Sequence, residues 1–450
     1  MKKAFLFLIL FFFACSKPAL ALENNQFGIH ITQTEDLTKA AELVNSNGGD
    51  WGYVTVVIQD SDKDQKKWQK FFDLCRGKHL IPLVRIATHL QGEAWERPTL
   101  ESISDWANFL DSLNWPVKNR YLIVFNEPNH DKEWGGKANP EEYALILDQA
   151  LVIFEQKSPD FLVLNAGFDQ AAPNSKTTIE EFKFLKAMNT RVPGIFSRLD
   201  GWVSHSYPNH GFVGKPWESG KATIKGYEWE LGILKNNFAV NKELPVFITE
   251  TGWLNQEKMA QFVKQAFEEV WLKDEKIIAI TPFILNYPFS PFANFSWLDA
   301  EGNPYPQYEI VKKMVKIKGQ PVQIIKFEMM KTSLPSFLPA NLIFKGKVFL
   351  KNTGQSIWGE EPFEIKSQSP GLKLTSLKLI EGKLIKPGET AELDFSLEAP
   401  NITDVYQIAW EGLSQYELKV FEVWKLTENK ETIFNRIIRA IFDLRYRLWF

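Results

Sequence analysis

The chain has 450 residues, 44% of them hydrophobic and 14% aromatic, which is enough to bury a large core and excludes a largely disordered protein. The formal net charge is −3, and removal of the first 21 residues, which include three lysines, would leave −6 (−3 − 3). Because an acidic chain is a poor partner for nucleic acid, we expect no nucleic-acid binding.

The first 21 residues have the pattern of a secretory signal peptide. Two lysines precede an apolar run over residues 4–14, and Ala19-Leu20-Ala21 has the small residues of a cleavage site. The apolar run is too short to span a bilayer comfortably. We therefore expect it to be removed and the mature protein to be extracytoplasmic: secreted, periplasmic or on the cell surface.

The two cysteines leave one alternative open. Cys15 would carry a lipid if the leader were a lipoprotein signal, although Phe12 stands where such signals usually have Leu. If the leader is removed, Cys75 has no partner, so no disulfide can form within the chain. The apolar helical pattern around Cys75 predicts a buried thiol.

Residues 22–318 alternate short apolar strands with amphipathic helical segments. The predicted strands cover residues 27–32, 52–58, 80–87, 120–125, 161–166, 201–205, 244–249 and 277–285. The predicted helices cover residues 35–47, 62–78, 100–113, 140–157, 176–191, 221–237, 255–273 and 307–318. No phosphate-binding glycine turn follows the first strand, so the pattern favours an α/β fold of the (β/α)8 TIM-barrel type over a doubly wound sheet.

The composition changes after residue 318. We predict a linker at 319–340 and a small antiparallel β-sandwich at 341–424, because apolar residues there alternate in period two between turn signals. The segment 346–358, which contains Asn352-Thr353-Gly354 and Trp358, resembles immunoglobulin-like accessory domains.

Residues 425–450 are predicted to form a C-terminal basic amphipathic helix. Within 432–450 the apolar residues share one stripe, and four arginines stand against one aspartate. Such a helix packs on its own protein or on an oligomer partner. The alternative is peripheral attachment to an anionic membrane surface, and the sequence leaves this choice and the oligomeric state open.

Two glutamates carry the main functional signal. Glu127 follows the fourth predicted strand in Asn126-Glu127-Pro128, and Glu250 follows the seventh. The C-terminal ends of barrel strands form one face, where this fold carries its catalytic residues. Five of the six histidines, all except His79, also follow a predicted strand. Because carboxylates are costly to bury, two of them at this face predict glycoside cleavage by paired carboxyl groups.

With these motifs the chain resembles glycoside hydrolase clan A, whose barrels carry an Asn-Glu-Pro acid/base after strand four and a nucleophile after strand seven. The resemblance implies that Glu127 is the acid/base and Glu250 the nucleophile. It further implies substrate-binding roles for Asn126 at the sugar 2-hydroxyl, for His205 and Tyr207 as a His-x-Tyr element, and for Trp297 as the floor of the sugar subsite. Segments 127–129 and 134–136 resemble β-xylosidase-like members, while 250–253 resembles cellulase-like β-glucanases, so the family within the clan stays open.

Four further residues are predicted to contact the substrate or the nucleophile. Arg85 ends the third strand and would hold Glu250 ionised, with a structural salt bridge as the alternative. His30, like His89, would donate a hydrogen bond to a sugar. Trp253 would contact the sugar face, and for both Trp253 and Trp297 the alternative is packing within their own loops.

The resemblance implies retention of anomeric configuration through a covalent glycosyl-enzyme, on a β-linked oligo- or polysaccharide of unspecified sugar. Glu250 is expected to ionise near an ordinary carboxyl pKa, whereas Glu127, facing that charge, is expected to keep its proton to higher pH. We expect no cofactor and no metal ion. Two alternatives remain: a carbohydrate-binding surface protein without turnover, and a metal-dependent barrel hydrolase, for which the first strand lacks the His-x-His pair.

Overall fold

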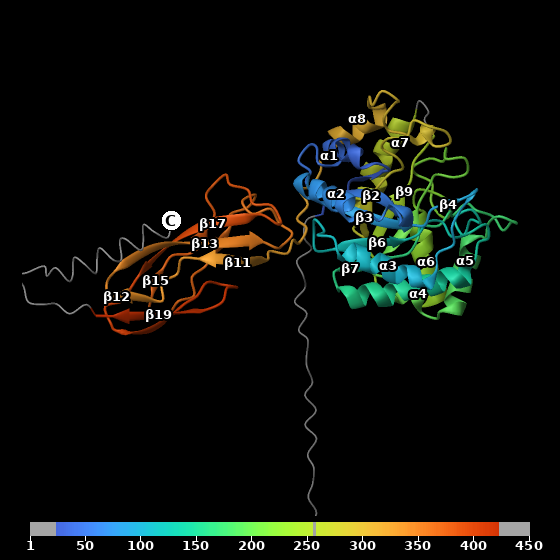
Figure 1. Ribbon diagram of the computed structural model, residues 1–450. Helices are drawn as coiled ribbons and strands as arrows, with labels where there is room; N and C mark the ends of the chain where they lie inside the picture. The colour runs from blue at the N-terminus through green and yellow to red at the C-terminus, as the bar shows by residue number, and fades with distance from the viewer. Residues whose placement is uncertain (1–23, 255–257, 423–450) are drawn as a thin grey trace, which may run out of the picture. The chain divides into compact units, whose positions relative to one another are not determined.

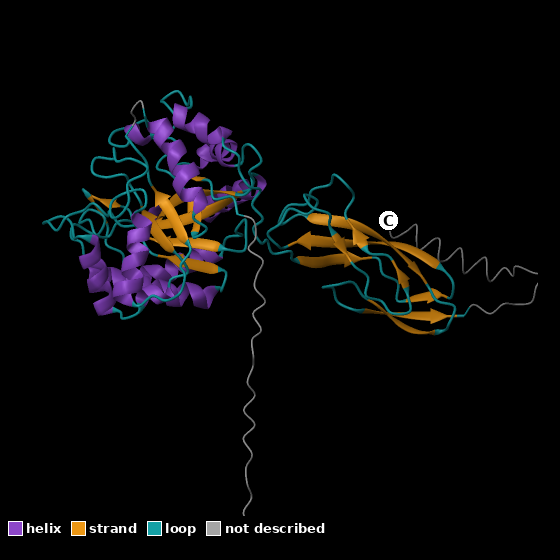
Figure 2. Cartoon of the chain, turned by 180° about the vertical axis from the view of Figure 1, so that it is seen from behind, coloured by secondary structure: helices purple, strands orange, loops and turns teal. Residues whose placement is uncertain are grey.

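The structure is a computed structural model that describes residues 24–254 and 258–422. The predicted signal peptide at 1–21 and the predicted helix at 425–450 lie outside these residues. The chain divides into two compact units between Ile324 and Ile325. In the described residues the first unit combines helices and strands, whereas the second is built from strands alone (Figures 1 and 2).

Eight parallel strands form a closed ring in the first unit. They are β1 (Gly28–Ile31), β2 (Gly52–Gln59), β3 (Leu80–Ala87), β6 (Arg120–Val124), β7 (Phe161–Leu164), β8 (Trp202–His205), β9 (Val246–Glu250) and β10 (Ile277–Ile280). Strands that are consecutive in this series also pair in space, in one sheet of five and one of three. Parallel bridges between Leu164 and Gly201 and between Phe27 and Ile280 join the two sheets and close the ring. The predicted α/β unit with parallel strands is therefore confirmed.

Helices cover the outside of the ring (Figure 2). They are α1 (Leu37–Val44), α2 (Gln65–Gly77), α3 (Leu100–Asp111), α4 (Pro140–Lys157), α5 (Glu181–Arg191), α6 (Gly226–Phe238), α7 (Met259–Gln265) and α8 (Pro306–Lys313). Helix α7 continues into a π turn at Ala266–Val270 and a 3-10 turn at Trp271–Lys273, and further 3-10 turns lie at Thr34–Asp36, Asp60–Asp62, Ile195–Arg198 and Ala293–Phe295. The longest helix begins where Asn139 caps the backbone N–H of Glu142 and Pro140 fixes the first turn.

Side chains alternate between the inside and the outside of the ring. The inner core contains Tyr53, Leu83, Val203 and Phe247, among others. The outward residues pack against the helices in a larger core. Because both faces of these strands are buried, they read in the sequence as nearly continuous apolar runs, which is why the sequence locates them well.

Two carboxyl groups are buried behind the ring without an ion pair among the described residues. Glu181 of α5 and Glu230 of α6 are each 0% exposed, and none of their carboxylate oxygens makes a hydrogen bond of normal geometry. Burial raises the pKa of both groups, and the charge of Glu230 raises the pKa of Glu181 further. Burial and the closeness of the two groups therefore both favour the protonated form of a carboxyl group in this pair.

The second unit is a β structure. Its strands are β11 (Phe327–Thr332), β12 (Phe337–Pro339), β13 (Ile343–Asn352), β14 (Glu364–Ile365), β15 (Lys373–Leu374), β16 (Leu377–Lys378), β17 (Thr390–Glu398), β18 (Asp404–Ile408) and β19 (Tyr416–Phe421). One sheet has the order β11-β13-β17-β15 and another β12-β19-β18, and β14 pairs with β16. The pairs are antiparallel except for β12 with β19. Residues of both larger sheets share one core, and the immunoglobulin-like classification stays a prediction.

Part of the segment predicted as a linker lies in these sheets. β11 pairs with β13 and β12 pairs with β19, although both fall within 319–340. β11 is an edge strand whose side chains alternate between half-buried and exposed positions over most of its length. It therefore carries no buried apolar run, and only its pairing with β13 defines it as a strand.

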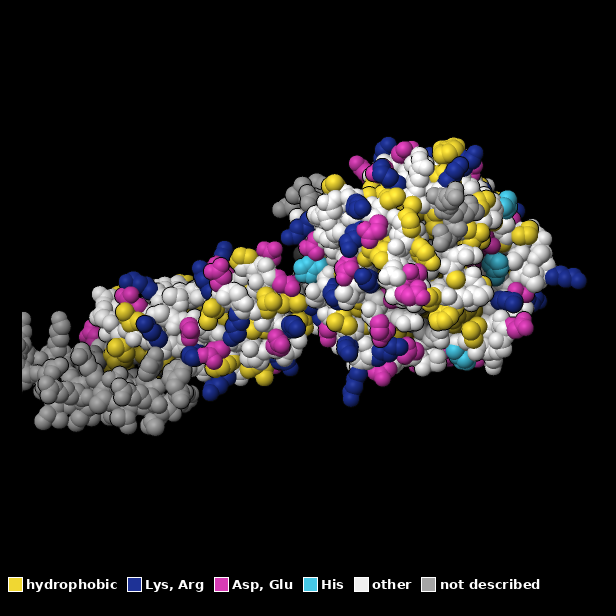
Figure 3. Space-filling view, turned by 90° about the horizontal axis from the view of Figure 1, so that it is seen from above, with side chains coloured by type: hydrophobic (Ala, Val, Ile, Leu, Met, Phe, Trp, Pro, Cys, Tyr) yellow, Lys and Arg dark blue, Asp and Glu magenta, His cyan; other side chains and the backbone are white. Residues whose placement is uncertain are grey.

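Within the described ranges, the helices are all too short or too polar to cross a membrane. Cys75 is a buried free thiol. On the face of the first unit seen in Figure 3, acidic and basic side chains lie intermixed rather than in patches of one sign.

Two short strands were not expected. β4 (Leu90–Gln91) and β5 (Ala94–Trp95) form a hairpin in the loop that follows β3. Backbone hydrogen bonds fix this loop, since Glu96 N donates to His89 O at 2.8 Å and Gly135 N donates to Trp95 O at 2.9 Å. The hairpin thereby holds Trp95 at the end of the ring where the strands finish.

Candidate active site

Side chains on the inner face of the ring include residues of the predicted site at the C-terminal ends of the strands. On β3, Ile81 and Leu83 belong to the inner core, and Arg85 is the next residue on the same face. On β8, Val203 of the inner core is followed two positions later by His205, which ends the strand. The period of two therefore projects Arg85 and His205 into the C-terminal end of the ring.

Glu250 reaches this end through an irregularity in β9. Phe247 belongs to the inner core, so regular alternation would turn Thr249 inward and Glu250 outward. The pairing of β9 with β8 skips one residue between Ile248 and Glu250. This β-bulge turns the Glu250 side chain inward. The hydroxyl of Thr281 on β10's extension donates to the free carbonyl of Thr249 at 3.0 Å and supports the bulge.

Glu127 lies in a tight turn after β6. Its φ is 28°, in a region that residues with a Cβ seldom occupy. The turn is held on both sides, because Glu127 N donates to Gly167 O at 3.1 Å and His130 N donates to Glu127 O at 2.9 Å. Asn129, fully buried, donates from its side chain to Asp169 O at 3.0 Å. These bonds fix the direction in which Glu127 points.

His205 lies between the two glutamates because Gly167 leaves room for it. A Cβ at position 167 would lie 2.1 Å from His205 Cδ2, so the ring packs directly on the glycine backbone. His205 Nδ1 is 2.8 Å from Glu127 Oε1 and 3.8 Å from Glu250 Oε2. Burial lowers the pKa of His205, but the charges of Glu250 and Glu127 outweigh this and the net pKa is raised.

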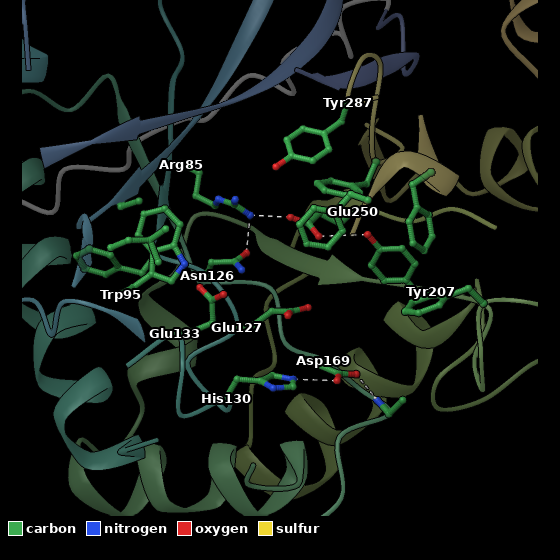
Figure 4. A pocket seen from close by; sticks show the side chains of 18 of the residues that line it. Arg85, Trp95, Asn126, Glu127, His130, Glu133, Asp169, Tyr207, Glu250 and Tyr287 are labelled. Carbon is green, nitrogen blue, oxygen red and sulfur yellow. Dashed lines mark hydrogen bonds and ion pairs between the residues drawn. The ribbon is translucent and has the colours of Figure 1, made fainter. Parts of the chain in front are cut away.

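The two glutamates face the same space. One carboxylate oxygen of Glu127, one of Glu250 and a ring nitrogen of His205 all lie within 4.8 Å of one another. Figure 4 shows Glu127 and Glu250 projecting into one pocket, Glu127 from the turn after β6 and Glu250 from the end of β9.

Besides His205, three side chains surround Glu250. Arg85 Nη1 donates to Glu250 Oε1 at 2.6 Å and to the Asn126 side-chain oxygen at 2.5 Å. The Tyr207 hydroxyl donates to Glu250 Oε2 at 3.2 Å. His30 Nδ1 is 3.8 Å from Oε1. Arg85 therefore holds Oε1 of this carboxylate in place, and Tyr207 holds Oε2.

This environment keeps Glu250 ionised. Burial alone would raise the pKa of Glu250, but the charges of His205 and Arg85 outweigh burial and lower the pKa to about 2. Burial, together with Arg85, lowers the pKa of His30 to about 3, so His30 is neutral at physiological pH. The predicted ordinary pKa of Glu250 is therefore corrected, because the number of basic groups around it depends on the folded structure.

The glutamates open into a cleft of about 530 Å³ (Figure 4). Its polar lining contains Arg85, Asn126, Glu127, His130, Glu133, Asp169, Tyr207 and Glu250, among others. Its apolar lining contains the aromatic side chains Trp95, Phe125, Phe212, Phe283, Tyr287, Phe292 and Phe295. Flat apolar rings beside a few converging polar groups can bind a ligand that has apolar faces and polar edges, as a sugar has.

The structure brings seven of the nine predicted site residues together. Arg85, Asn126, Glu127, Tyr207 and Glu250 line the cleft, and His30 and His205 are buried beneath it against Glu250. His30, at 1% exposure, contacts Phe283 and Glu250 rather than open space.

Trp253 and Trp297 do not line the cleft. Trp253 is 2% exposed and Trp297 is 1% exposed, and both pack in the outer core. Trp253 Nε1 donates to Gly214 O at 2.7 Å, which ties two loops together. The predicted sugar contacts of these two residues are corrected: the large indoles fill space behind the loops, and Phe295 occupies the cleft instead of Trp297.

Several lining residues were missed by the sequence analysis. Glu133, Asp169 and Tyr287 lie in loops between strands, and Trp95 lies in the two-residue strand β5, so no periodicity predicts the direction of these side chains. The one available signal was position, since each follows a strand end. His130 was noted only for that reason, and its Nε2 lies 2.9 Å from Asp169 Oδ2.

Two groups of side chains in the described residues have the spacing of metal ligands. The first is Glu127, His205 and Glu250. Arg85 already donates to Glu250 there, so a metal ion would lie against a fixed positive charge. The second is Asp60, His89 and Glu96, all partly exposed, in which His89 Nδ1 lies 2.9 Å from Asp60 Oδ1. His89 is absent from the lining of the cleft, and its sugar contact stays a prediction.

No protein-family model matches the chain, and no curated protein matches it. Several solved glycosidase structures resemble it. A monomeric β-xylosidase from Caulobacter crescentus CB15 is 12% identical, with 85% of this chain and 97% of that chain covered and a TM-score of 0.47. An endo-β-1,4-glucanase from Xanthomonas axonopodis pv. citri is 12% identical, with 64% and 98% covered and a TM-score of 0.44. A GH128 endo-β-1,3-glucanase from Pseudomonas viridiflava is 13% identical, with 65% and 98% covered and a TM-score of 0.42.

Proposed function

We propose that this protein is a retaining glycoside hydrolase that cleaves β-glycosidic bonds of an oligo- or polysaccharide. The observation that carries the proposal is the pair of glutamate carboxylates, with oxygens within 4.8 Å of each other, in a cleft lined by aromatic rings. Retaining enzymes hold their carboxyl groups about 5 to 5.5 Å apart, whereas inverting enzymes separate them by about 6.5 to 9.5 Å to admit a water molecule.

Glu250 has the properties of the nucleophile. It is ionised over the whole physiological range, and Arg85 and Tyr207 hold its two oxygens in a fixed orientation. An oriented carboxylate can attack the anomeric carbon directly, with little reorganisation before the reaction. As the bond from Glu250 to the anomeric carbon forms, the bond from that carbon to the leaving oxygen breaks.

Glu127 is the proposed acid and base. In the first step it gives a proton to the glycosidic oxygen, so that the leaving group departs as an alcohol. In the second step it accepts a proton from a water molecule, whose oxygen attacks the anomeric carbon and releases Glu250. The contact with His205 and the tight turn after β6 hold Glu127 in position for both transfers.

Replacement of Glu250 by glycine tests this assignment. The variant should lose turnover on an activated aryl β-glycoside by a factor of at least about 10⁴, because covalent catalysis is removed. Added azide should restore the reaction and yield a glycosyl azide of inverted anomeric configuration, which NMR identifies. Full activity of the variant would refute the role of Glu250.

The substrate has to be found before this test. The mature protein is incubated with a panel of β-linked oligosaccharides and of plant, fungal and bacterial polysaccharides, and the products are identified by mass spectrometry. Binding of a glycan without release of any product would favour the alternative of a carbohydrate-binding protein on the same barrel. Loss of activity on removal of metal ions, restored by adding them back, would favour the metal-dependent alternative.

A further inference from the structure

Glu133 is the carboxyl group in the cleft that lacks a basic partner among the described residues. The other three each have one: Glu250 is paired with Arg85, Glu127 with His205, and Asp169 with His130. Figure 4 shows the Glu133 side chain beside Glu127 and Asn126, pointing into the same space. An acid in a cleft without a basic partner is stable only if it keeps a proton or receives a partner from outside.

Burial and five neighbouring side chains act on Glu133. Burial and the charges of Glu127 and Glu250 raise its pKa, while Arg85 and a hydrogen bond with Asn126 lower it, and His130 is also within electrostatic reach. Burial is the largest influence and Glu127 is the largest of the charges, and together they raise the pKa of Glu133 to about 7. Asn126 can donate to Glu133 because its side-chain oxygen is already occupied by Arg85.

Glu127 has to carry a proton to act as the acid, and His205 is a basic group that competes for this proton, since its Nδ1 is 2.8 Å from Glu127 Oε1. A second carboxyl group beside Glu127 offers another place for the proton, because two neighbouring carboxylates in a partly dry cleft do not both ionise readily.

We propose that Glu133 is a positioning residue for the proton of the reaction: Glu127 and Glu133 together keep one proton in the free enzyme, and Glu127 delivers it to the glycosidic oxygen. This inference rests on the proposed function. The proton leaves the pair as the bond between the anomeric carbon and the leaving oxygen breaks. It returns from the attacking water when the bond to Glu250 is hydrolysed, so each cycle ends with the pair again carrying one proton.

Glu133→Gln tests the role through the choice of leaving group. A phenyl β-glycoside needs protonation of its leaving oxygen, whereas a 2,4-dinitrophenyl β-glycoside of the same sugar leaves without it. At pH 7.5 we expect kcat/KM of the variant on the phenyl glycoside to fall by at least about 10-fold, with its alkaline limb moved about one pH unit lower. On the dinitrophenyl glycoside kcat/KM should stay within about 2-fold of the wild type, because that reaction makes no use of the acid.

Two further variants separate this role from a structural one. Glu133→Asp keeps a carboxyl group and should recover part of the lost activity and of the alkaline limb. Glu93→Gln removes a glutamate that is 90% exposed on the β4–β5 turn and should change neither substrate's rate. Equal losses on both glycosides in Glu133→Gln, or an unmoved alkaline limb, would overturn the proposal.

An infrared titration decides the matter independently of turnover. In the wild type, a protonated carboxyl band should disappear between pH 5 and 8, and this change should be absent in Glu133→Gln. If the wild type hydrolyses nothing, the proposed function fails while the titration still reports whether the pair keeps its proton. Absence of the band change in the wild type overturns the proposal even if hydrolysis is found.

Discussion

Removal of the Arg85 guanidinium should raise the pH at which the enzyme loses activity in acid. Arg85 Nη1 is 2.6 Å from Glu250 Oε1, and the two side chains are only 13% and 10% exposed. Coulomb's law with an effective dielectric constant of about 20 gives about 6 kcal/mol at this distance. Burial offsets part of that attraction, and truncation of one partner of a buried pair typically costs about 3 to 5 kcal/mol.

We take the lower figure, about 3 kcal/mol, which corresponds to about 2 pKa units. Arg85→Gln should therefore raise the pKa of Glu250 from about 2 to an almost ordinary carboxyl value. Glu250 must be ionised to attack, so the acid limb of kcat/KM moves upward by the same amount. The sign also holds for stability: a lowered pKa in the folded state stabilises the protein above the ordinary carboxyl pKa, and this contribution is lost as the pH falls toward 2.

The assay is kcat/KM on a 2,4-dinitrophenyl glycoside between pH 3 and 8, where protonation of the leaving group has no influence on the rate. The wild type should retain its plateau down to about pH 3, whereas Arg85→Gln should have lost half of its own plateau near pH 4. Arg120→Gln is the matched control: it also breaks an arginine–carboxylate pair, with Asp111 at 2.8 Å, but at the N-terminal end of β6. An unmoved acid limb in Arg85→Gln would refute the argument.

Two further predictions concern packing and buried charge. Gly167→Ala should displace the His205 ring and lower kcat by about 100-fold, as expected for a misplacement of about 1 Å. The control Gly232→Ala, where the added methyl group on α6 meets open space, should leave kcat unchanged. A normal kcat in Gly167→Ala would contradict the close packing. Glu181→Gln should raise the urea midpoint of unfolding at pH 8 by an amount equivalent to about 1 to 3 kcal/mol, because the raised pKa values of Glu181 and Glu230 mean that stability is lost as the pH rises above the ordinary carboxyl range. The gain should shrink at pH 5, and an equal gain at both pH values would show that the pair does not control it.

The sequence predicted the ring well because its strands are buried on both faces. Their apolar runs are long enough to be recognised as strands. Residues near or after the ends of these runs, such as Arg85 and Glu127, could therefore be assigned to one end of the barrel. The sequence could not predict the bulge in β9, since Thr249 and Glu250 continue the strand without any irregular residue type. Glu250 was singled out by its place at the end of an apolar run, and the clan resemblance supplied its expected role, whereas alternation from Phe247 would have turned it outward.

The loops were predicted least well. Trp297 was expected at the cleft from the clan resemblance and Trp253 because indoles bind sugars, but an indole is also a large apolar group that fills loop interiors. Glu133 stands in a loop where no period applies, and nothing in its neighbours Lys132 and Trp134 shows which way it points. In the second unit, β11 was assigned to a linker because an edge strand has no buried apolar run.

The bulge in β9 has a consequence for how such a protein can diversify. Glu250 enters the cleft because the bulge adds one extra residue to its strand. An insertion or deletion anywhere between Phe247 and Glu250 would therefore turn the carboxylate out of the ring. In the loops after the strands, the direction of a side chain does not depend on an exact number of residues in this way. Segments such as 129–139 and 208–220 can change length and composition, and with them the choice of ligand, while the strand that ends at Glu250 tolerates no change in length.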